Sequence, residues 1–275
     1  MSNLVKRILS SIVFVALIVG PLFMSNRISY SVYGILGLLT LNELLSLSKK
    51  TDSHPNKVLS IGMYLVQLLL VYNVVYESGN NVAILATIGL LLLLASAVLM
   101  VFIDDKRPLE GLSVSLFSSL YVGISFLGIA YFSSYRVDLP HPWITIALFS
   151  IIWINDSAAY LFGRKIGKTK LIERVSPNKT IEGSVSGLIV AMIAAGSASF
   201  LDGMPDLWIM LGFGLVCVVF GSLGDLIESR FKRAAGVKDS GVFLPGHGGF
   251  LDRFDAMMLA IPAAIVYFEL VLPKA

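Results

Sequence analysis

The stretch DLWIMLGFGLVCVVFGSLGDLI, residues 206–227, shows the kind of fold that this chain encodes. Nearly all of it is apolar, and at 1.5 Å per residue a helix of this length crosses a hydrocarbon core of roughly 30 Å. Runs of similar length recur along the 275 residues, of which 56% are hydrophobic and only 14% are charged. Because soluble domains carry about 25% charged residues, this composition predicts a protein embedded in a lipid bilayer.

The apolar segments predict an all-α polytopic membrane protein with about nine transmembrane helices. Short polar linkers with turn-forming residues separate them, and no repeat or soluble-domain-sized insert interrupts them. We therefore expect a single membrane domain over residues 1–275, with N-terminal spans in 1–142 and catalytic spans and cytoplasmic loops in 143–275. The expected helices cover about residues 8–24, 29–46, 58–76, 82–103, 112–133, 143–163, 183–200, 206–227 and 255–272.

The first apolar segment follows Lys6 and Arg7, so it superficially resembles a secretory signal peptide. No small-x-small cleavage site follows it, and the next apolar run begins almost at once. We therefore expect this segment to remain as the first transmembrane helix.

The positions of the basic residues predict the topology of the spans. With the N-terminus inside, alternation places 18 of the 21 Lys and Arg residues on the inner side and leaves only Arg27, Arg136 and Lys274 outside. This bias follows the positive-inside rule, so we expect a cytoplasmic N-terminus and an outside C-terminus in a multi-pass protein of the cell (inner, cytoplasmic) membrane. The two longest loops, 164–182 and 228–254, are then cytoplasmic, and an active site should face the cytoplasm.

Several carboxylates lie inside the predicted spans or at their edges. Asp156 interrupts an apolar helix, whereas Asp225 and Glu228 close the eighth span and Asp252 and Asp255 open the ninth. Each pair has a three-residue spacing, which places both members on one face of a helix. A carboxylate at such depth costs about 2.5 kcal/mol or more unless it is paired, hydrated or metal-bound. These residues are therefore candidates for function, and structural ion pairs with nearby Lys or Arg are the alternative.

The kinds of residue present suggest which metal such carboxylates would bind. The chain has a single cysteine, Cys217, in an apolar run and lacks a His or Cys cluster that could hold zinc. Carboxylates that converge on one membrane face suit a hard cation such as Mg²⁺, which usually binds one or two carboxylates and the substrate's phosphates. For Glu43, near the inner end of the second span, a functional role and a structural ion pair are equally open.

The segment GVKDSGVFLPGHGGFLDRFD, residues 236–255, is dense in glycine and charge. Its glycines permit positive φ and a close approach of backbone N–H groups to phosphate oxygens. His247 could orient a phosphate or donate a proton, or it could be a hydrogen-bonding bystander. A basic loop that touches anionic lipid headgroups is the alternative for the whole segment, but such a loop needs neither glycines nor embedded aspartates. Cations that could contact phosphate are Lys232, Arg233, Lys238 and Arg253.

In the other long loop, SPNKTIEG at residues 176–183 predicts a turn that enters a helix. Thr180 or Asn178 could cap this helix, whose positive end would lie near the cytoplasmic face. Lys179 would then stand where a triphosphate could be bound. Capping alone explains this stretch about as well.

Residues 229–255, SRFKRAAGVKDSGVFLPGHGGFLDRFD, resemble the signature of the bacterial and eukaryotic phosphatidate cytidylyltransferases, or CDP-diacylglycerol synthases. All fixed positions of that signature are met, over a pattern too specific for a chance match. The first five spans are similar to the family only in hydropathy and layout. The rest of the resemblance, over roughly residues 150–260, rests on NDSAAY at 155–160, SPNKTIEG at 176–183 and Gly224-Asp225.

The resemblance implies a nucleotidyltransferase that converts CTP and phosphatidate into CDP-diacylglycerol and pyrophosphate for phospholipid biosynthesis. It also implies dependence on Mg²⁺, and it leaves open a second divalent or a monovalent cation. The implied partners are CTP, phosphatidate, the lipid bilayer and a second copy of the chain in a homodimer; no nucleic acid is expected.

The resemblance also implies roles for individual residues. Asp225 and Asp252 are expected as primary metal ligands, with Asp156, Asp239 and Asp255 as further ligands or as anchors for basic residues. The expected catalytic residues are Asp225, Asp252, Lys238, Asp239 and His247. The expected substrate-binding residues are Lys179, Lys232, Arg233, Lys238, Gly248, Gly249 and Arg253.

Three other functions are alternatives to cytidylyl transfer. A CDP-alcohol phosphatidyltransferase would show a DxxDGxxAR-type run, whereas here Asp202-Gly203 stands alone in an exterior turn. Another nucleotide-dependent lipid-headgroup transferase remains the main alternative. A transporter usually has broken helices at the midplane and polar residues on both faces. In this sequence the polar residues crowd the cytoplasmic side.

Overall fold

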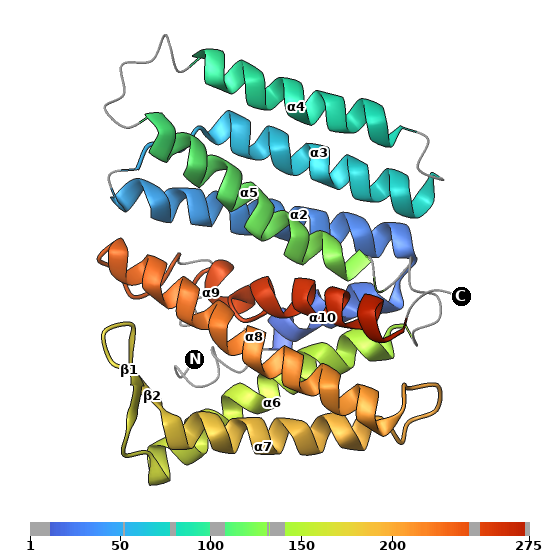
Figure 1. Cartoon of the computed structure of the whole chain (residues 1–275), viewed down its shortest axis with the longest axis vertical. Helices are drawn as coiled ribbons and strands as arrows, with labels where there is room; N and C mark the ends of the chain where they lie inside the picture. Colours follow the sequence, from blue (N-terminus) through green and yellow to red (C-terminus); the bar gives the residue numbers. More distant parts are fainter. Residues whose placement is uncertain are drawn as a thin grey trace. The chain divides into compact units, whose positions relative to one another are not determined.

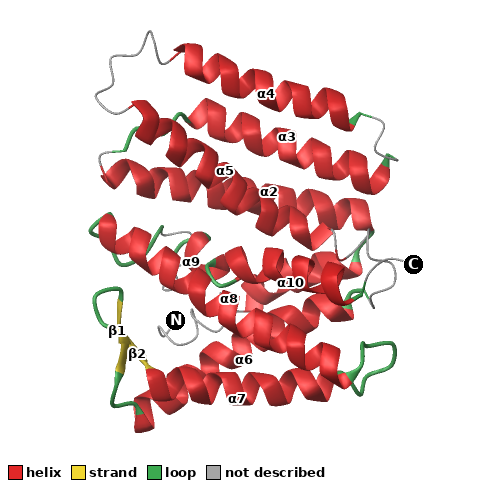
Figure 2. Ribbon diagram, in the orientation of Figure 1, coloured by secondary structure: helices red, strands yellow, loops and turns green. Residues whose placement is uncertain are grey.

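Long α-helices make up most of the chain, as the apolar runs predict (Figure 2). The computed structural model describes residues 12–51, 53–77, 81–99, 108–130, 132, 141–241 and 248–272. It divides into two units, each considered by itself below. The first unit comprises Met1–Tyr135 and Ala234–Arg253, and the second comprises Arg136–Arg233 and Phe254–Ala275.

In the first unit, four long helices pack side by side (Figure 1). Helix α2 (Asn26–Ser48) packs against α3 (Lys57–Tyr76) and α5 (Pro108–Ala130), because Gly37 of α2 leaves room there: a Cβ at this position would meet the Tyr64 ring and the Phe126 Cβ. The Tyr64 hydroxyl donates a 3.0 Å hydrogen bond to the carbonyl oxygen of Gly34. Asn56 caps the helix that follows it by accepting from Leu59 N at 3.0 Å. The elements are η1 (Gly20–Phe23), α2 (Asn26–Ser48), η2 (Lys49–Thr51), α3 (Lys57–Tyr76), α4 (Val82–Leu99) and α5 (Pro108–Ala130).

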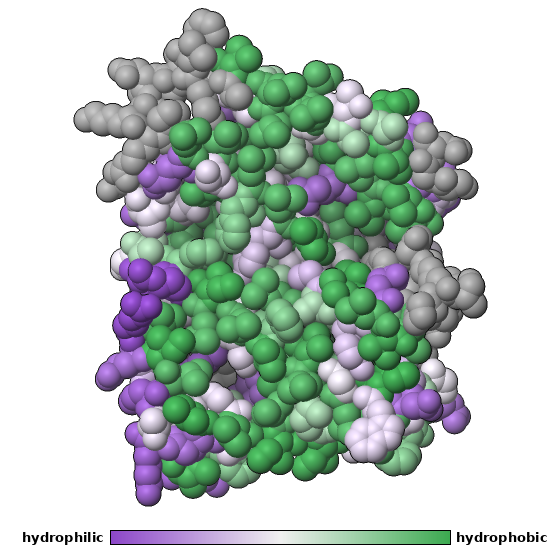
Figure 3. Space-filling view, viewed as in Figure 1, coloured by the Kyte–Doolittle hydropathy of each residue, from purple (hydrophilic) through white to green (hydrophobic). Residues whose placement is uncertain are grey.

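The second unit contains four long helices and a short antiparallel hairpin, in which Lys170 pairs with Thr180 and Ile172 with Ser176. This hairpin lies in the 164–182 loop, where the sequence predicted only a turn. Figure 3 shows hydrophilic side chains gathered around the hairpin and hydrophobic ones over the neighbouring helices. The elements are α6 (Trp143–Ile166), β1 (Lys170–Ile172), β2 (Ser176–Thr180), α7 (Ile181–Ala198), α8 (Leu207–Ala234) and α10 (Met257–Val271). The short α9 (Leu251–Phe254) belongs to the first unit except for its last residue.

Two differences from the predicted helices affect predicted site residues. α8 continues past residue 227, so Glu228, Lys232 and Arg233 are helical and do not lie in a loop. The chain leaves the helix near Gly236, whose φ of 67° no helical residue adopts. The predicted ninth helix, about residues 255–272, corresponds to α10; the short α9 precedes it, and Asp255 lies at the break between the two.

Among the residues that the structure describes, seven helices are long and apolar enough to cross a membrane. Two further apolar helices, within Ile12–Phe23 and Val82–Ser96, are shorter. The structure therefore supports a polytopic all-α membrane fold, with one small hairpin, and it does not fix the number of crossings at nine. The seven helices are Asn26–Thr51, Lys57–Tyr76, Leu109–Ile129, Trp143–Ile166, Ile181–Ala198, Leu207–Ala234 and Leu251–Val271.

Helix α7 shows how the two faces of such a helix differ. The side chains of Ile181, Val185, Ile189 and Ile193 recur every fourth residue and are 43%, 51%, 56% and 65% exposed, as expected of a face turned to lipid. The opposite face carries small residues at the same period and packs against α6. Small residues let two helix backbones approach closely, which is how helices associate inside a membrane. These small residues are Gly183, Gly187, Ala191 and Ala195.

Gly187 should be sensitive to the smallest enlargement. A Cβ there would lie 2.8 Å from both the backbone and side-chain oxygens of Asn155 and 2.9 Å from the Ala159 Cβ. We expect Gly187→Ala to lower the melting temperature of the protein in detergent, with a destabilisation of about 1–3 kcal/mol typical of overpacking. Gly196→Ala on the same helix is the control, because its Cβ would meet only leucine methyl groups at 3.4 Å. Gel filtration after heating measures both, and equal melting temperatures would contradict the packing argument.

Candidate active site

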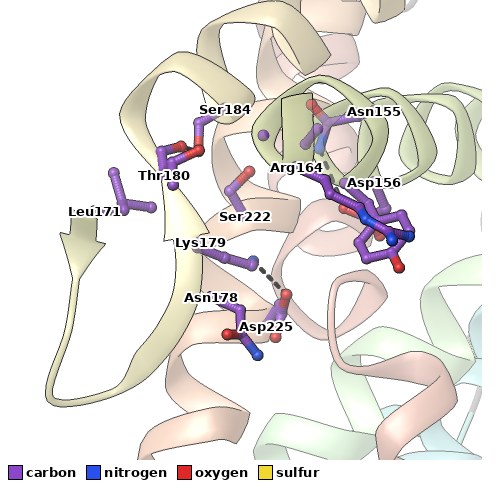
Figure 4. A pocket seen from close by; sticks show the side chains of 13 residues that line it. Asn155, Asp156, Arg164, Leu171, Asn178, Lys179, Thr180, Ser184, Ser222 and Asp225 are labelled. Atoms are coloured by element: carbon purple, nitrogen blue, oxygen red, sulfur yellow. Dashed lines mark hydrogen bonds and ion pairs between the residues drawn. The ribbon is translucent and has the colours of Figure 1, made fainter. Parts of the chain in front are cut away.

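A pocket of about 480 Å³ lies within the second unit, among α6, β2, the start of α7 and α8 (Figure 4). Its lining mixes apolar carbons with a small set of charged and amide side chains, as ligand pockets of this size do. The lining residues are Asn155, Asp156, Ala159, Tyr160, Gly163, Arg164, Leu171, Asn178, Lys179, Thr180, Ser184, Ser222 and Asp225.

Helix α6 supplies one wall of the pocket through Asp156, Tyr160 and Arg164, which follow one another at four-residue spacing. This spacing places them along one side of the helix. Asn155 is buried beside them and donates a 3.2 Å hydrogen bond from Nδ2 to Asp156 Oδ1. The amide therefore holds the carboxylate at the pocket. The sequence predicted Asp156 but gave no role to Arg164.

The hairpin and α7 position Lys179. Thr180 caps α7 by accepting from Gly183 N at 3.2 Å, which confirms one of the two predicted caps. Glu182 accepts hydrogen bonds from the backbone N–H groups of Lys168 and Thr169 at 3.0 and 3.1 Å, and so fastens the start of the hairpin to the helix. With the strand fixed in this way, the half-buried side chain of Lys179 points into the pocket and pairs with Asp225 (Figure 4).

Three carboxylates meet where α8 passes the break between α9 and α10. One oxygen each of Asp225, Glu228 and Asp255 lies within 4.8 Å of the other two. Glu228 is fully buried and pairs with Lys232, one turn further along α8. Asp225 Oδ1 also accepts a 3.2 Å hydrogen bond from the Ser229 hydroxyl. Like charges at this spacing repel each other unless cations compensate them.

Gly224 allows this meeting of carboxylates. A Cβ at this position would collide with the carbonyl oxygen of Asp255 and lie 3.1 Å from that of Ala256. Without a side chain, α8 can lie against the backbone at the helix break, and this brings Asp255 beside Asp225. One turn earlier, a Cβ on Gly221 would lie 3.7 Å from its nearest neighbours, which is ordinary contact.

The donor set of this cluster fits a divalent cation. All three ligands are hard carboxylate oxygens, the kind that Mg²⁺ and Ca²⁺ bind, and their separation lets them converge on one ion. A fully buried carboxylate such as Glu228 also requires nearby positive charge. The sequence placed Glu228 on one face with Asp225 but did not assign it as a ligand, although the three-residue spacing was the available signal.

Most of the remaining predicted residues lie in the first unit. Asp252 Oδ2 accepts hydrogen bonds from Ser240 N at 2.8 Å, Ser240 Oγ at 3.0 Å and Gly249 N at 2.8 Å. Gly248 has a φ of 80°, as the predicted glycine turn requires. Lys238 and Asp239 are exposed, and Arg253 is half-buried.

The structure thus brings together Asp156, Lys179, Asp225 and Asp255 of the predicted site. Asp252 belongs to the other unit, and its assignment as a metal ligand stays a prediction. Of the remaining predicted residues, Lys232 and Arg233 lie at the end of α8, and His247 lies outside the described residues.

Comparison with known proteins places the chain in a family. A model of the cytidylyltransferase family matches residues 5–271, which is nearly the whole chain. The chain belongs to the cytidylyltransferase family. It is 39% identical over 232 residues to the phosphatidate cytidylyltransferase of Staphylococcus aureus (strain COL) and 38% identical over 233 residues to that of Staphylococcus haemolyticus (strain JCSC1435). Both matches cover 83% of this chain and 85% of the relative, so they extend well beyond the signature segment.

Gly224 provides a test of the carboxylate cluster. We expect Gly224→Ala to push the Asp255 backbone away from α8 and to weaken binding of Mn²⁺, measured by electron paramagnetic resonance, by about tenfold or more. Gly221→Ala should leave the affinity for Mn²⁺ unchanged, because its Cβ fits the existing space. Equal affinities in the two variants would show that the cluster does not bind the ion.

Proposed function

We propose that this family member transfers the cytidylyl group of CTP to phosphatidate, giving CDP-diacylglycerol and pyrophosphate, at the pocket beside Asp225. The observation that carries the proposal is the position of Lys179, which reaches a pocket of about 480 Å³ and pairs there with one of three clustered carboxylates. The names of the relatives, phosphatidate cytidylyltransferases, support the same substrates.

The reaction joins two anions, so its main obstacle is charge repulsion. A phosphate oxygen of phosphatidate attacks the α-phosphorus of CTP, a new P–O bond forms, and the bond to the bridging oxygen breaks as pyrophosphate leaves. The attacking oxygen is already ionised near neutral pH, and no strong general base is needed. The protein must therefore supply positive charge and alignment, as in other phosphoryl-transfer enzymes.

Asp225, Glu228 and Asp255 are the residues that would hold Mg²⁺. When bound, this ion would neutralise phosphate charge at the attacked phosphorus and the departing pyrophosphate. Asp156 is proposed as a further ligand or as a partner of a basic residue, and a second cation is left open. Magnesium is preferred over calcium because it usually completes its coordination with substrate phosphates.

Lys179 and Arg164 are the cations proposed to contact the triphosphate. In this structure, Lys179 compensates the charge of Asp225. If Asp225 held a divalent cation, the ammonium group of Lys179 would be available to a phosphate oxygen. Arg164 lines the same pocket and offers a planar pair of donors that match phosphate oxygens.

The membrane helices suit a lipid substrate. Phosphatidate must keep its acyl chains in lipid while its headgroup meets a water-soluble nucleotide. We propose nine crossings, with the two shorter apolar helices included, a cytoplasmic N-terminus and a pocket that opens to the cytoplasm. A homodimer, implied by the resemblance, is also part of this proposal.

The direct test uses the purified chain in detergent with labelled CTP and phosphatidate. We expect a lipid-soluble CDP product that requires Mg²⁺, disappears with a chelator and returns when Mg²⁺ is restored. A folded protein that gives no product with any divalent cation would refute the proposal. A product formed only with a different lipid acceptor would favour another nucleotide-dependent lipid-headgroup transferase.

Asp225→Asn tests the proposed site within that assay. Because the amide keeps the shape but loses the charge that would bind Mg²⁺, turnover should fall by at least about 100-fold, while folding and membrane insertion stay intact. Asp206→Asn is the matched control, since Asp206 is an exposed carboxylate just before α8. If both variants kept near-wild-type turnover, Asp225 would not be part of the active site.

Reporters of membrane topology test the number of crossings. We expect a reporter fused after Glu77 and one fused after Leu109 to lie on opposite sides, because α4 lies between them. The Glu77 fusion should be outside and the Leu109 fusion cytoplasmic. If both report the same side, α4 does not cross, and the nine-span proposal is wrong.

A further inference from the structure

Glu43 contacts a segment of chain almost 200 residues away from it in sequence. It lies near the end of α2, and its half-buried carboxylate reaches the glycine-rich signature segment within the first unit. Glu43 Oε2 accepts a 2.8 Å hydrogen bond from Leu251 N and a 3.0 Å hydrogen bond from the Ser240 hydroxyl. A single carboxylate oxygen therefore joins two points of the segment that are eleven residues apart.

Two glycines of the segment leave room for this carboxylate. A Cβ at Gly241 or at Gly249 would overlap the carboxylate oxygens of Glu43. A Cβ at Gly249 would also lie 2.5 Å from the Ser240 Oγ. The sequence predicted that Gly249 would face a phosphate. In the structure, the space beside Gly249 is taken by the side chain of Glu43.

The same contacts connect Glu43 to Asp252. The Ser240 hydroxyl lies 3.0 Å from both Glu43 Oε2 and Asp252 Oδ2, and it has one proton to donate. The backbone N–H groups of Ser240 and Gly249 donate to Asp252, while that of Leu251 donates to Glu43. Hydrogen bonds to a charged acceptor are roughly twice as strong as neutral ones, so two adjacent carboxylates can hold this loop.

We propose that Glu43 is a positioning residue, which fixes the backbone at Ser240 and Leu251 and thereby orients the side chains of Lys238, Asp239 and Asp252. The effect on turnover rests on the proposed function, because it requires that this segment acts in cytidylyl transfer. The effect on the backbone does not depend on it. These contacts are to backbone and hydroxyl donors, so they differ from the ion pair that was one of the two alternatives for Glu43.

Hydrogen exchange measures the backbone effect directly, with the full-length protein in detergent. We expect Glu43→Ala to speed amide exchange in peptides that contain Ser240 and Leu251 by about tenfold or more, with a smaller effect for Glu43→Gln, which keeps an acceptor oxygen. Asn42→Ala, at the exposed neighbouring position on α2, should leave exchange there unchanged. Peptides from α7, in the second unit, should exchange at the wild-type rate in every variant.

A double-mutant cycle on turnover separates positioning from a general loss of stability. Gly241→Ala should cost turnover strongly when Glu43 is present and clearly less in the Glu43→Ala background, because the three atoms nearest to a Cβ at position 241 all belong to the Glu43 side chain. Unchanged exchange in Glu43→Ala, or additive costs in the cycle, would overturn the proposal. A wild-type protein that makes no CDP lipid would refute the proposed function instead, and the exchange result would still decide the role of Glu43.

Discussion

The site depends on the compensation of negative charge in the second unit. Asp225, Glu228 and Asp255 lie close together, and Glu228 is fully buried, so their mutual repulsion must be offset. Lys232 pairs with Glu228 from the same helix, and Lys179 pairs with Asp225 from the hairpin. A divalent cation would satisfy the same requirement more fully. The two ion pairs in the structure and the proposed metal ion would therefore offset the same negative charge.

The local structure around the cluster follows from this requirement. The hairpin places Lys179 beside Asp225 because hydrogen bonds of Glu182 and Thr180 hold the hairpin at the start of α7. Helix α8 can approach the break between α9 and α10 because position 224 has no side chain. In the first unit, glycines act in a similar way, since Gly249 makes room for a carboxylate that holds its own loop. In both units, these glycines therefore leave space for other groups of the protein. For Gly249, the sequence had predicted a contact with phosphate instead.

Much of the fold could be predicted from hydropathy, because a long apolar run has few alternatives to a helix. The predicted segment 143–163 became α6, and 183–200 became α7 with boundaries shifted by two residues. Helix ends that carry charged residues were less predictable. α8 continues through Glu228 and Lys232, which form an ion pair at four-residue spacing, but charged residues are equally common in a loop. The hairpin was missed because its strands are too short to show a periodic pattern.

The site could be predicted only in part. Asp156, Lys179, Asp225 and Asp255 could be named as candidates because a carboxylate near the membrane is costly and because the family signature and the motifs around it contain these residues. The partners of these residues depend on tertiary contacts that no local pattern records, as for Glu43, whose hydrogen-bonding partners lie about 200 residues further along the chain. Whole-chain similarity to known cytidylyltransferases supplies the reaction, whereas the geometry suggests how Lys179 takes part in it.

The chemical reactivity of Lys179 tests the proposed role of Asp225 most directly. The protein is labelled with an amine-specific acylating reagent, and mass spectrometry measures the labelled fraction of Lys179. In the metal-free protein, pairing with Asp225 should keep labelling of Lys179 low. Mg²⁺ alone should raise labelling, because Asp225 then binds the ion, and Mg²⁺ with CTP should lower it again as the ammonium group contacts phosphate. Labelling that stays the same under all three conditions would contradict the claim that Asp225 exchanges Lys179 for a metal ion.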